Sequence, residues 1–367
     1  MPIDRAVFAA RRERAAAALR GRGLAALLLS PSSDLVYLCG YRMHASERLT
    51  CLVLTADGAA TIVVPGLESP RAKTAAPDLA QRTWAETEDP YAMVASLVRD
   101  KGDVAVADQM SALFLLRLED ALAGRSFQLA STITRELRMR KDAPERDALR
   151  AVAESADRAY ARMRDREFAG RREREIAAEL AHLLQEEGHD EVTFTIVASG
   201  PNGASPHHET GDRVVAKGDT IVLDFGGTRG WYCSDITRTV VVGKPADEQI
   251  KVHDTVRRGQ EAGYTAARSG ASAESVDAAA RKVIEDAGYG QYFIHRTGHG
   301  IGLDGHEHPY LVSGNGERLE PGMAFSIEPG IYLPGKFGVR IEDIAVIGDD
   351  GAAVPLNRAD HALAVVQ

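Results

Sequence analysis

Cysteine, excess positive charge and long apolar stretches are all scarce in this sequence. Only three cysteines occur among 367 residues, and they lack CxxC spacing, which fits a protein of a reducing compartment. The formal net charge of −9 argues against a nucleic-acid or anionic-membrane partner held by electrostatic attraction. No apolar run reaches membrane-spanning length, and the charged N-terminal segment lacks the apolar core of a signal peptide. We therefore expect a cytoplasmic protein without a membrane or nucleic-acid partner.

The composition is that of a globular protein, with 44% hydrophobic and 26% charged residues, and the length predicts two domains. Residues 1–140 alternate predicted strands and helices, which favours a small α/β domain. Helices are expected at 4–22, 90–99 and 110–121, strands at 24–29 and 103–107, and a hairpin at 50–64 around Asp57-Gly58. Residues 34–38 fit either helix or strand. The region has no phosphate loop and no ligand cluster, so its role is structural or it covers a site on its neighbour.

A second domain is expected to begin near residue 141, where Asp142-Ala143-Pro144-Glu145 predicts a helix start with proline in the first turn. Its predicted helices are 144–168, 172–187, 246–269 and 273–287, and its strands are 192–199, 220–225, 236–242, 291–295, 323–328 and 338–347. A loop rich in glycine and histidine follows strand 192–199, and another follows strand 291–295. This order is a repeat of two helices, a strand, a histidine loop and a hairpin.

The hairpin at 220–242 carries two acids. Its first strand ends at Phe225, glycines 226, 227 and 230 are expected to form the turn with Arg229, and its second strand begins at Ile236. Asp224 and Asp235 therefore come close across the ladder. Because like charges facing each other on a sheet are unfavourable, this pair calls for a shared proton or a shared cation. Two hydrated turn acids are an equally good interpretation of the hairpin alone.

A local repeat extends this pattern. Residues 217–226 align with residues 321–330, so that a glycine precedes the acid by six positions and another follows it by two in both copies. The acid of the second copy is Glu328, and Glu342 follows it by fourteen positions, as Asp235 follows Asp224 by eleven. We infer two αββ halves related by a pseudo-twofold axis, with the four carboxylates where the halves meet.

Four carboxylates at one seam need a counter-ion, and divalent cations are the physical solution. A bridging carboxylate serves two metals about 3.5–4 Å apart, which can share a hydroxide. The candidate imidazole ligand is His299, which Gly298 and Gly300 flank. Mixed oxygen and imidazole ligands suit manganese, cobalt, zinc or iron better than calcium or magnesium.

Two other motifs are misleading. Residues 300–305 satisfy GxGxxG, but the GHEHP that follows at 305–309 prevents the helix that a dinucleotide site needs. His295 and His299 have the spacing of a helical zinc motif. Their flanking glycines disfavour a helix, however, and Arg296 stands where HExxH needs glutamate.

Four stretches within residues 145–347 resemble the catalytic domain of the pita-bread metallopeptidases, the family of methionine aminopeptidase, aminopeptidase P, prolidase and creatinase. They are IVASGPNGASPHH, VLDFGGTRGWYCSDITRTVVVG, TGHGIGLDGHEHP and MAFSIEPGIYLPGKFGVRIED. The resemblance implies an α+β fold: a pita-bread catalytic domain at 141–367 after a smaller α/β creatinase-type domain at 1–140, which serves substrate gating and dimerisation. It also implies a two-metal centre, most readily of manganese. The implied ligands are Asp224, Asp235, His299, Glu328 and Glu342, with Asp235 and Glu342 bridging.

Further residues match family positions. His207 and His306 resemble the histidines that contact the substrate and stabilise the intermediate, and Glu328 would also act as acid and base. His295 resembles a substrate-contacting histidine of the proline-specific branch. A strand histidine whose ring nitrogens are hydrogen-bonded within the protein is an equally good interpretation. Arg340 resembles an arginine that orients ligand carboxylates. His208 and His308 are interpreted as loop residues.

The expected activity is hydrolysis of the bond before proline, by a hydroxide that bridges two divalent metals. The N-terminal domain favours the proline-specific and creatinase branches, and within them we favour an Xaa-Pro dipeptidase, a prolidase. The alternatives are an aminopeptidase P acting on longer peptides, a creatinase-like amidinohydrolase and an inactive binding module. Arg48 is a candidate for the carboxylate of a dipeptide, although a solvated surface arginine is the simpler interpretation. The family resemblance implies a homodimer.

Overall fold

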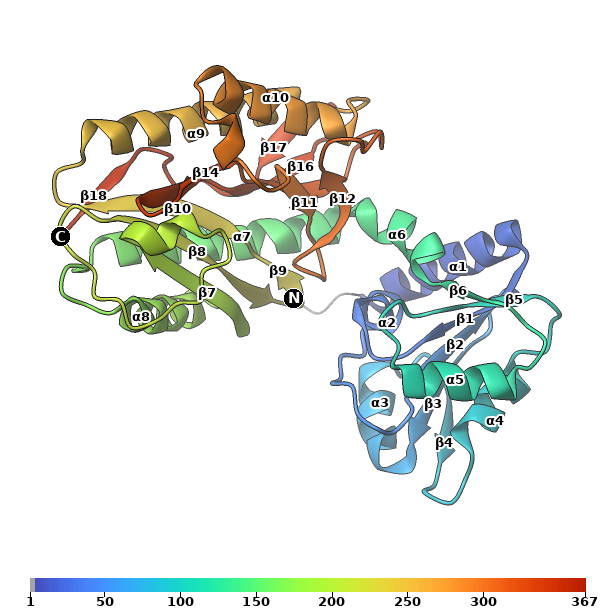
Figure 1. Ribbon diagram of the computed structural model, residues 1–367. Helices are drawn as coiled ribbons and strands as arrows, with labels where there is room; N and C mark the ends of the chain where they lie inside the picture. Colours follow the sequence, from blue (N-terminus) through green and yellow to red (C-terminus); the bar gives the residue numbers. More distant parts are fainter. Residues whose placement is uncertain (1–3) are drawn as a thin grey trace. The chain divides into compact units, whose positions relative to one another are not determined.

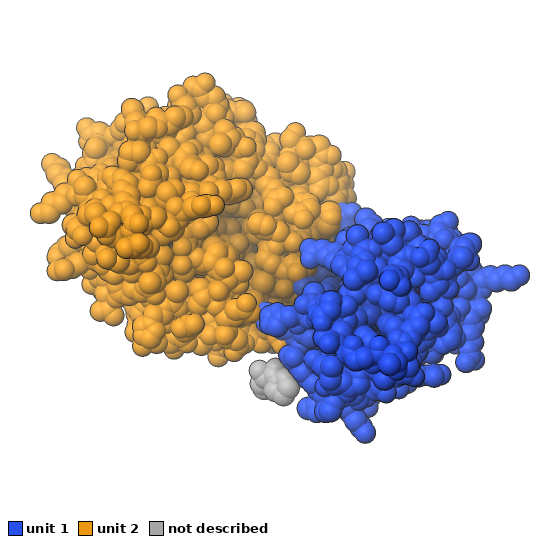
Figure 2. Space-filling view, turned by 60° about the horizontal axis from the view of Figure 1, so that its bottom comes forward, with its two compact units in different colours: residues 1–138 blue, residues 139–367 orange. Residues whose placement is uncertain are grey.

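The computed structural model describes residues 4–367. The chain forms two compact units, one ending at Arg138 and the other beginning at Met139 (Figure 2). None of the helices within 4–367 is long and apolar enough to cross a membrane.

The unit that ends at Arg138 is built on a six-stranded mixed sheet (Figure 1). The strand order is β4 (Ala80–Trp84), β3 (Ala60–Pro65), β2 (Cys51–Thr55), β1 (Leu24–Leu29), β5 (Asp103–Val106) and β6 (Phe127–Leu129). The helices are α1 (Arg5–Arg22), α2 (Ser33–Cys39), α3 (Ser69–Ala75), α4 (Pro90–Leu97), α5 (Ala112–Ala121) and α6 (Ser131–Met139). Apolar side chains of α4 and α5, among them Val94, Phe114 and Leu118, pack on β1 and β2 as one buried cluster.

The predicted helices, strands and hairpin of this unit are confirmed within a few residues. The ambiguous segment 34–38 is helical, because the Ser32 side chain accepts a hydrogen bond from Leu35 N at its start and Gly40 takes a left-handed conformation at its end. Helix α3 and strands β4 and β6 were not predicted. Strand β4 is mostly exposed and β6 has three residues, so neither shows the apolar pattern of a core strand.

The unit that begins at Met139 has two halves. The first half contains α7 (Ala143–Arg164), α8 (Glu173–Glu186) and a sheet ordered β18 (Ala364–Val366), β10 (Ile236–Val242), β8 (Thr220–Arg229) and β7 (Glu191–Ser199), with β9 (Tyr232–Cys233) paired to β8. The second contains α9 (Asp247–Ala266), α10 (Ala273–Asp286) and a sheet ordered β12 (Glu307–Leu311), β11 (Gly298–Gly300), β13 (Ala324–Ile327), β16 (Asp343–Ile347) and β17 (Ala353–Pro355). A separate hairpin joins β14 (Gly330–Leu333) and β15 (Phe337–Arg340).

Helices α9 and α10 run side by side along the second half of this unit, and α8 lies beside β7 in the first half (Figure 1). The pseudo-twofold repeat predicted from the sequence is confirmed in the backbone, because equivalent turns make the same hydrogen bonds in both halves. The matching bonds are Gly170 N to Val215 O (2.8 Å) and Gly270 N to Leu319 O (2.8 Å), then Gly218 N to Val242 O (2.7 Å) and Gly322 N to Ile347 O (2.8 Å).

Two predicted turn glycines prove to be strand residues. Gly226 and Gly227 lie inside β8, and the turn falls at Gly230 and Trp231, both with positive φ. Glycine is required in the strand because neighbouring backbone approaches closely. A Cβ on Gly226 would stand 2.1 Å from Ser234 O, and one on Gly227 would stand 2.3 Å from a carbonyl oxygen of β7.

Two strand predictions in the second half were also wrong. Residues 291–295 form no strand, and a short 3₁₀ helix covers Gly290–Tyr292. Arg281 of α10 donates hydrogen bonds to the carbonyls of Phe293 and His295, so these groups need no neighbouring strand. The predicted strand 338–347 is two strands in different sheets, β15 and β16. The break between them contains Glu342.

Candidate metal centre

The candidate ligands come from both halves and meet at the seam between the two sheets. Each lies within or beside a strand end. Asp224 is in β8, Asp235 directly precedes β10, His299 is in β11, Glu328 directly follows β13, and Glu342 lies between β15 and β16. The register of β8 and β10 places Asp224 opposite Thr237, and an isolated bridge places Thr237 opposite Glu342. Thr237 therefore links the acids of the two halves.

These side chains form three overlapping groups, and the potential ligand atoms of each group lie within 4.8 Å of one another. The groups are Asp224, Asp235 and Glu342; His299, Glu328 and Glu342; and Asp235, His299 and His306. Glu342 belongs to the first two groups and Asp235 to the first and third, which is the arrangement expected of shared carboxylates. His299 Nε2 lies 3.4 Å from Glu328 Oε1 and 3.7 Å from Asp235 Oδ2.

The protein alone does not balance the charge of this cluster. Burial raises the pKa of Asp235 and of Glu342 well above the usual range, and the neighbouring carboxylates raise both pKa values further. Burial also raises the pKa of Glu328 to about 7, although the Arg340 charge opposes this shift. The pKa of His299 falls to about 3 because the ring is buried, so the imidazole is neutral and can act as a ligand.

The free atoms of the cluster fit a divalent cation. Asp224 Oδ1 and Glu342 Oε1 are buried and have no hydrogen-bond partner within residues 4–367. The other oxygen of each carboxylate is held: Arg340 binds Asp224 Oδ2, and Thr237 Oγ1 donates to Glu342 Oε2 at 2.7 Å. His299 Nδ1 is likewise paired, with Gly300 O at 3.0 Å. Each side chain thus has one atom fixed and another directed into the cluster, as metal ligands require.

Arg340 lies where the resemblance implied, beside a ligand carboxylate. Its side chain is buried and binds Asp224 through Nη2. Nη1 donates to the Tyr332 hydroxyl at 2.7 Å, and Nε donates to Thr237 Oγ1 at 3.2 Å. Tyr332 and Thr237 were not identified from the sequence, because their role depends on contacts between β14, β15 and β10.

Among the histidines predicted to contact the substrate, His306 and His207 are exposed near the cluster, whereas both ring nitrogens of His295 are hydrogen-bonded. The His306 ring lies 3.9 Å from the His299 ring, measured between centroids, and the residue is exposed. The exposed His207 is close enough that its charge would lower the pKa of His295 and His306. His295 is satisfied, because Nε2 pairs with the Tyr332 hydroxyl at 2.8 Å and Nδ1 with Arg296 O at 2.7 Å. It lies beside the cluster without supplying a ligand atom to it.

Of the two histidines interpreted as loop residues, His208 lies in a loop, whereas His308 lies in β12. Both have structural contacts. His208 Nε2 lies 2.9 Å from Glu173 Oε2, and the same buried carboxylate accepts a hydrogen bond from Ser199 N at 2.7 Å. This pair ties the loop that carries His207 to the start of α8. The His308 ring packs on Tyr310, with 4.7 Å between centroids.

Arg296 is a cationic side chain that the sequence analysis noted only as a departure from a zinc motif. Its guanidinium carbon lies 4.4 Å from the centroid of the Tyr310 ring. The positive charge lowers the pKa of His299 and His306 and opposes the rise in the pKa of Glu328, so it is near the cluster. Among residues 4–367, no carboxylate forms an ion pair with it.

Arg48, the sequence candidate for binding a substrate carboxylate, lies in the unit that ends at Arg138. Its Nε donates to Glu86 Oε1 at 2.8 Å, and its Nη1 binds Glu47. Two acidic neighbours therefore already balance its charge.

Comparison with known proteins identifies both units. Residues 147–349 match the model of metallopeptidase family M24, and residues 11–140 match the creatinase/prolidase N-terminal domain. A probable dipeptidase, PepE, of Mycobacterium tuberculosis is 48% identical over 99% of this chain and 98% of its own length. An Xaa-Pro dipeptidase of Lactobacillus helveticus is 38% identical over 86% of this chain and 88% of its own.

A solved structure also resembles the whole chain. Recombinant prolidase from Thermococcus sibiricus superposes with a TM-score of 0.93 and 38% identity, over 100% of both chains. The expected α+β architecture, a pita-bread domain after a creatinase-type domain, is thereby confirmed. The chain is a peptidase that belongs to metallopeptidase family M24, whose members use divalent metal ions.

Proposed function

We propose that this protein is an Xaa-Pro dipeptidase, a prolidase, with two divalent metal ions per subunit. The observation that carries the proposal is a buried cluster in which Asp224 and Glu342 each have one carboxylate oxygen held by the protein and the other without a hydrogen-bond partner within residues 4–367. His299 is held through Nδ1, and its Nε2 faces the acids. The named activities of the Lactobacillus and Thermococcus relatives support the choice of substrate.

The proposed ligands of one metal are Asp224, Asp235 and Glu342, and those of the other are His299, Glu328 and Glu342, with Asp235 shared as well. When bound, such cations lower the pKa of a coordinated water and polarise the scissile carbonyl. The set of four carboxylates and one imidazole favours manganese, with cobalt, zinc or iron as alternatives.

The protein's own groups would orient the substrate and move the proton. We assign Glu328 the transfer of a proton to the leaving proline nitrogen, because its Oε1 faces the cluster and Ser326 Oγ donates to it at 3.3 Å. His306, which is exposed and lies beside His299, would donate a hydrogen bond to the substrate carbonyl oxygen. His207 would hold the substrate from the loop that Glu173 anchors.

Dipeptide preference needs a positive group for the substrate's free carboxylate, and Arg296 is better suited to this than Arg48. Arg296 is half-buried near Glu328 and its ion-pairing capacity is unused, whereas Arg48 is engaged by two acids. Stacking on Tyr310 also restricts the guanidinium, which reduces the entropy lost on binding. Arg296→Ala should raise KM for Ala-Pro and leave KM for Ala-Pro-Ala nearly unchanged. Equal effects on both peptides would remove Arg296 from this role.

The test of the whole proposal is release of proline from Ala-Pro and of alanine from Ala-Pro-Ala. Both are measured on the chelated enzyme and after addition of Mn²⁺, Co²⁺ or Zn²⁺. Metal-dependent cleavage of the dipeptide alone is the expected result. Preferential cleavage of the tripeptide would indicate an aminopeptidase P. Failure to cleave either with metal bound would favour creatinase-like chemistry or a binding module.

The proposal includes a cytoplasmic homodimer in which residues 1–140 gate the substrate and contribute to dimerisation. Cys39, Cys51 and Cys233 are all free thiols, which fits a reducing compartment. Sedimentation equilibrium of the intact chain tests the oligomeric state, and a monomer at micromolar concentration would contradict it.

A further inference from the structure

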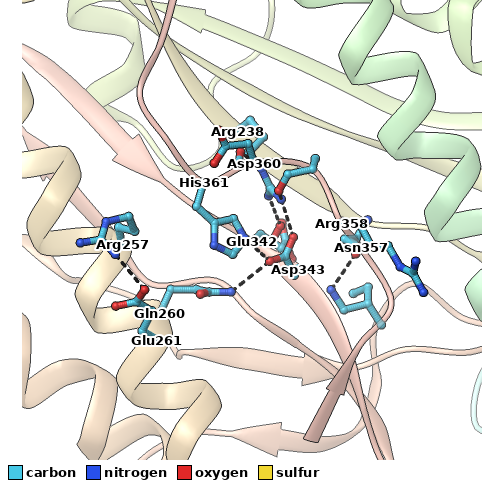
Figure 3. Close-up of polar contacts among 12 residues, drawn as sticks. Arg238, Arg257, Gln260, Glu261, Glu342, Asp343, Asn357, Arg358, Asp360 and His361 are labelled. Carbon is cyan, nitrogen blue, oxygen red and sulfur yellow. Dashed lines mark hydrogen bonds and ion pairs between the residues drawn. The ribbon is translucent and has the colours of Figure 1, made fainter.

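A buried polar network binds Glu342 on the side away from the ligand cluster (Figure 3). Because it falls in the break between β15 and β16, regular strand pairing does not fix it. Instead its N donates to Thr237 O at 3.1 Å, its Oε2 accepts from Thr237 Oγ1, and its carbonyl accepts from Arg238 Nη1 at 2.7 Å. Two consecutive residues of β10 therefore hold every polar group of Glu342 except Oε1.

The orientation of Arg238 is fixed in turn. Its side chain is 2% exposed, and Nη2 donates to Asp343 Oδ1 and to Ala359 O, both at 2.7 Å. Nε donates to Asp360 O at 3.1 Å. A buried guanidinium with donors paired in several directions has one stable orientation. A shift of Asp343 or of segment 357–361 would therefore move Arg238, and with it the Glu342 carbonyl that Arg238 binds.

Asp343 is where three elements converge. Arg238 reaches it from β10, Gln260 from α9 and His361 from the segment after β17 (Figure 3). Gln260 Nε2 donates to Asp343 Oδ2 at 3.2 Å, and His361 Nε2 binds the same oxygen. A buried carboxylate is stable only when its oxygens are paired, so loss of one partner shifts the others. The His361 side chain is 30% exposed and can be replaced without opening the core.

We propose that His361, Asp343 and Arg238 are positioning residues that set the metal affinity of the centre through Glu342. This inference rests on the proposed function in one respect, that Glu342 is a metal ligand. Loss of the His361 contact lets Asp343 and then Arg238 relax, which releases the Glu342 carbonyl and moves Oε1 away from the cluster. Outer partners of metal ligands typically change metal affinity by about 10–100-fold.

The test is calorimetric titration of the metal-free enzyme with Mn²⁺. We expect His361→Ala to weaken binding at one or both sites by about 10-fold. His361→Gln should restore most of the affinity, because its amide nitrogen can donate to Asp343 Oδ2. The matched control is His182→Ala, since His182 of α8 is also paired with an acid, Glu186, but is 68% exposed. Its Mn²⁺ affinity should equal that of the wild type.

Urea unfolding of the metal-free proteins separates positioning from simple stabilisation. If His361→Ala lowers the free energy of unfolding but leaves Mn²⁺ affinity within twofold of wild type, the proposal is overturned. Arg238→Lys, which keeps the charge and loses the planar fork, should weaken Mn²⁺ binding more than His361→Ala. If Arg238→Lys does not fold, the two His361 variants decide alone.

Failure of this inference is distinguishable from failure of the proposed function. Wild-type enzyme that cleaves Ala-Pro, together with unchanged Mn²⁺ affinity in His361→Ala, would overturn the network and keep the activity. Wild-type enzyme that binds Mn²⁺ but does not cleave Ala-Pro, together with weakened binding in His361→Ala, would overturn the activity and keep the network.

Discussion

The two halves of the unit that begins at Met139 have the same backbone plan and bury different side chains. The buried positions of α7 from Leu149 to Met163 recur in α9 one hundred residues later. Several apolar residues of α7 are replaced by polar ones at these positions. The pairs are Leu149 and Gln249, Ala153 and His253, and Tyr160 and Gln260.

This difference shows how each half is held. Helix α7 packs with β8 and β10 in one apolar cluster. Helix α9 also has apolar packing, through Val252 and Val256, but it adds directional contacts with both halves. Gln249 Nε2 donates to Thr220 Oγ1 of β8 at 2.7 Å, and Gln260 binds Asp343 of β16. Apolar packing tolerates small displacements, whereas hydrogen bonds fix the two sheets relative to each other where the ligands meet.

The acids of the two halves also differ in spacing. Asp224 and Asp235 are joined by a turn, with Asp224 in β8 and Asp235 directly before its partner β10. Glu328 and Glu342 are separated by the extra hairpin β14–β15, which carries Tyr332 and Arg340. The extra hairpin thus provides Arg340, whose guanidinium binds Asp224 of the other half.

The largest effect is expected from breaking the seam itself. Glu342→Gln removes the carboxylate that two of the three ligand groups share, so metal content should fall and kcat on Ala-Pro should drop about 10³-fold, the equivalent of several kcal/mol. Elemental analysis and steady-state kinetics measure both. Glu320→Gln, at an exposed acid paired with Arg140, is the control. Full metal content with wild-type kcat would contradict a ligand role for Glu342.

Arg340→Lys tests the contribution of the extra hairpin. Lysine keeps the charge but cannot bind Asp224, Tyr332 and Thr237 together, so we expect a loss of about 10–100-fold in kcat/KM or Mn²⁺ affinity. Arg257→Lys, on the surface of α9 and paired with Glu261, should be neutral. An equally small effect at both positions would show that charge alone suffices at Arg340.

Glycine replacements compare the halves at equivalent positions. Gly226→Ala places a Cβ 2.1 Å from a backbone oxygen and should lower the free energy of unfolding by about 1–3 kcal/mol. At the equivalent Gly330, a Cβ would stand 2.5 Å from the Tyr332 hydroxyl, which belongs to a side chain and not to the backbone. Gly330→Ala should therefore lower the free energy of unfolding less than Gly226→Ala does, but lower the activity more. Urea titration with Gly305→Ala as the open-space control tests this. Equal destabilisation by Gly330→Ala would contradict the comparison.

His253→Ala makes α9 resemble α7 at one position. Burial, with a smaller contribution from Arg257, lowers the pKa of His253 to about 4, below its ordinary value of 6.5. Between these values the unfolded chain binds the additional proton, so His253 destabilises the protein as pH falls, by about 1.4 kcal/mol per pH unit. His253→Ala should flatten the dependence of unfolding free energy on pH from 6.5 to 4. If unfolding free energy depends on pH as steeply in His253→Ala as in the control variant His182→Ala, the lowered pKa of His253 would be contradicted.

The smallest effect is expected at the surface contact between the extra hairpin and α9. Lys336 Nζ lies 2.8 Å from Glu248 Oε1, and both side chains are about half exposed. Because solvent and salt screen such pairs, Lys336→Ala should leave the free energy of unfolding nearly unchanged. Urea titration at low and high salt checks this. A clear, salt-dependent loss of stability would show that the pair anchors the hairpin.

Much of the second unit could be predicted because its chemistry is local in sequence. The αββ repeat, the paired acids and the glycines around His299 are read from neighbouring residues, and backbone hydrogen bonds repeat as the sequence does. The prediction that Gly226 and Gly227 form a turn was wrong, because glycine is required both in turns and where two backbones approach closely. The break at Glu342 was not predicted, because apolar β-branched residues such as Val339 and Ile344 continue the strand pattern on both sides of it.

The sequence by itself determined the two-domain order, the pseudo-symmetric halves and the five side chains proposed as metal ligands. Only the tertiary structure decided which oxygens of Asp224 and Glu342 are without a partner and that Arg340 crosses to Asp224. It also decided that no carboxylate within residues 4–367 pairs with Arg296, and that His361 supports Glu342 through Asp343 and Arg238. These features depend on side chains more than a hundred positions apart or on the burial of single atoms. Neither hydrophobic periodicity nor motif spacing encodes them, because both describe neighbours along the chain.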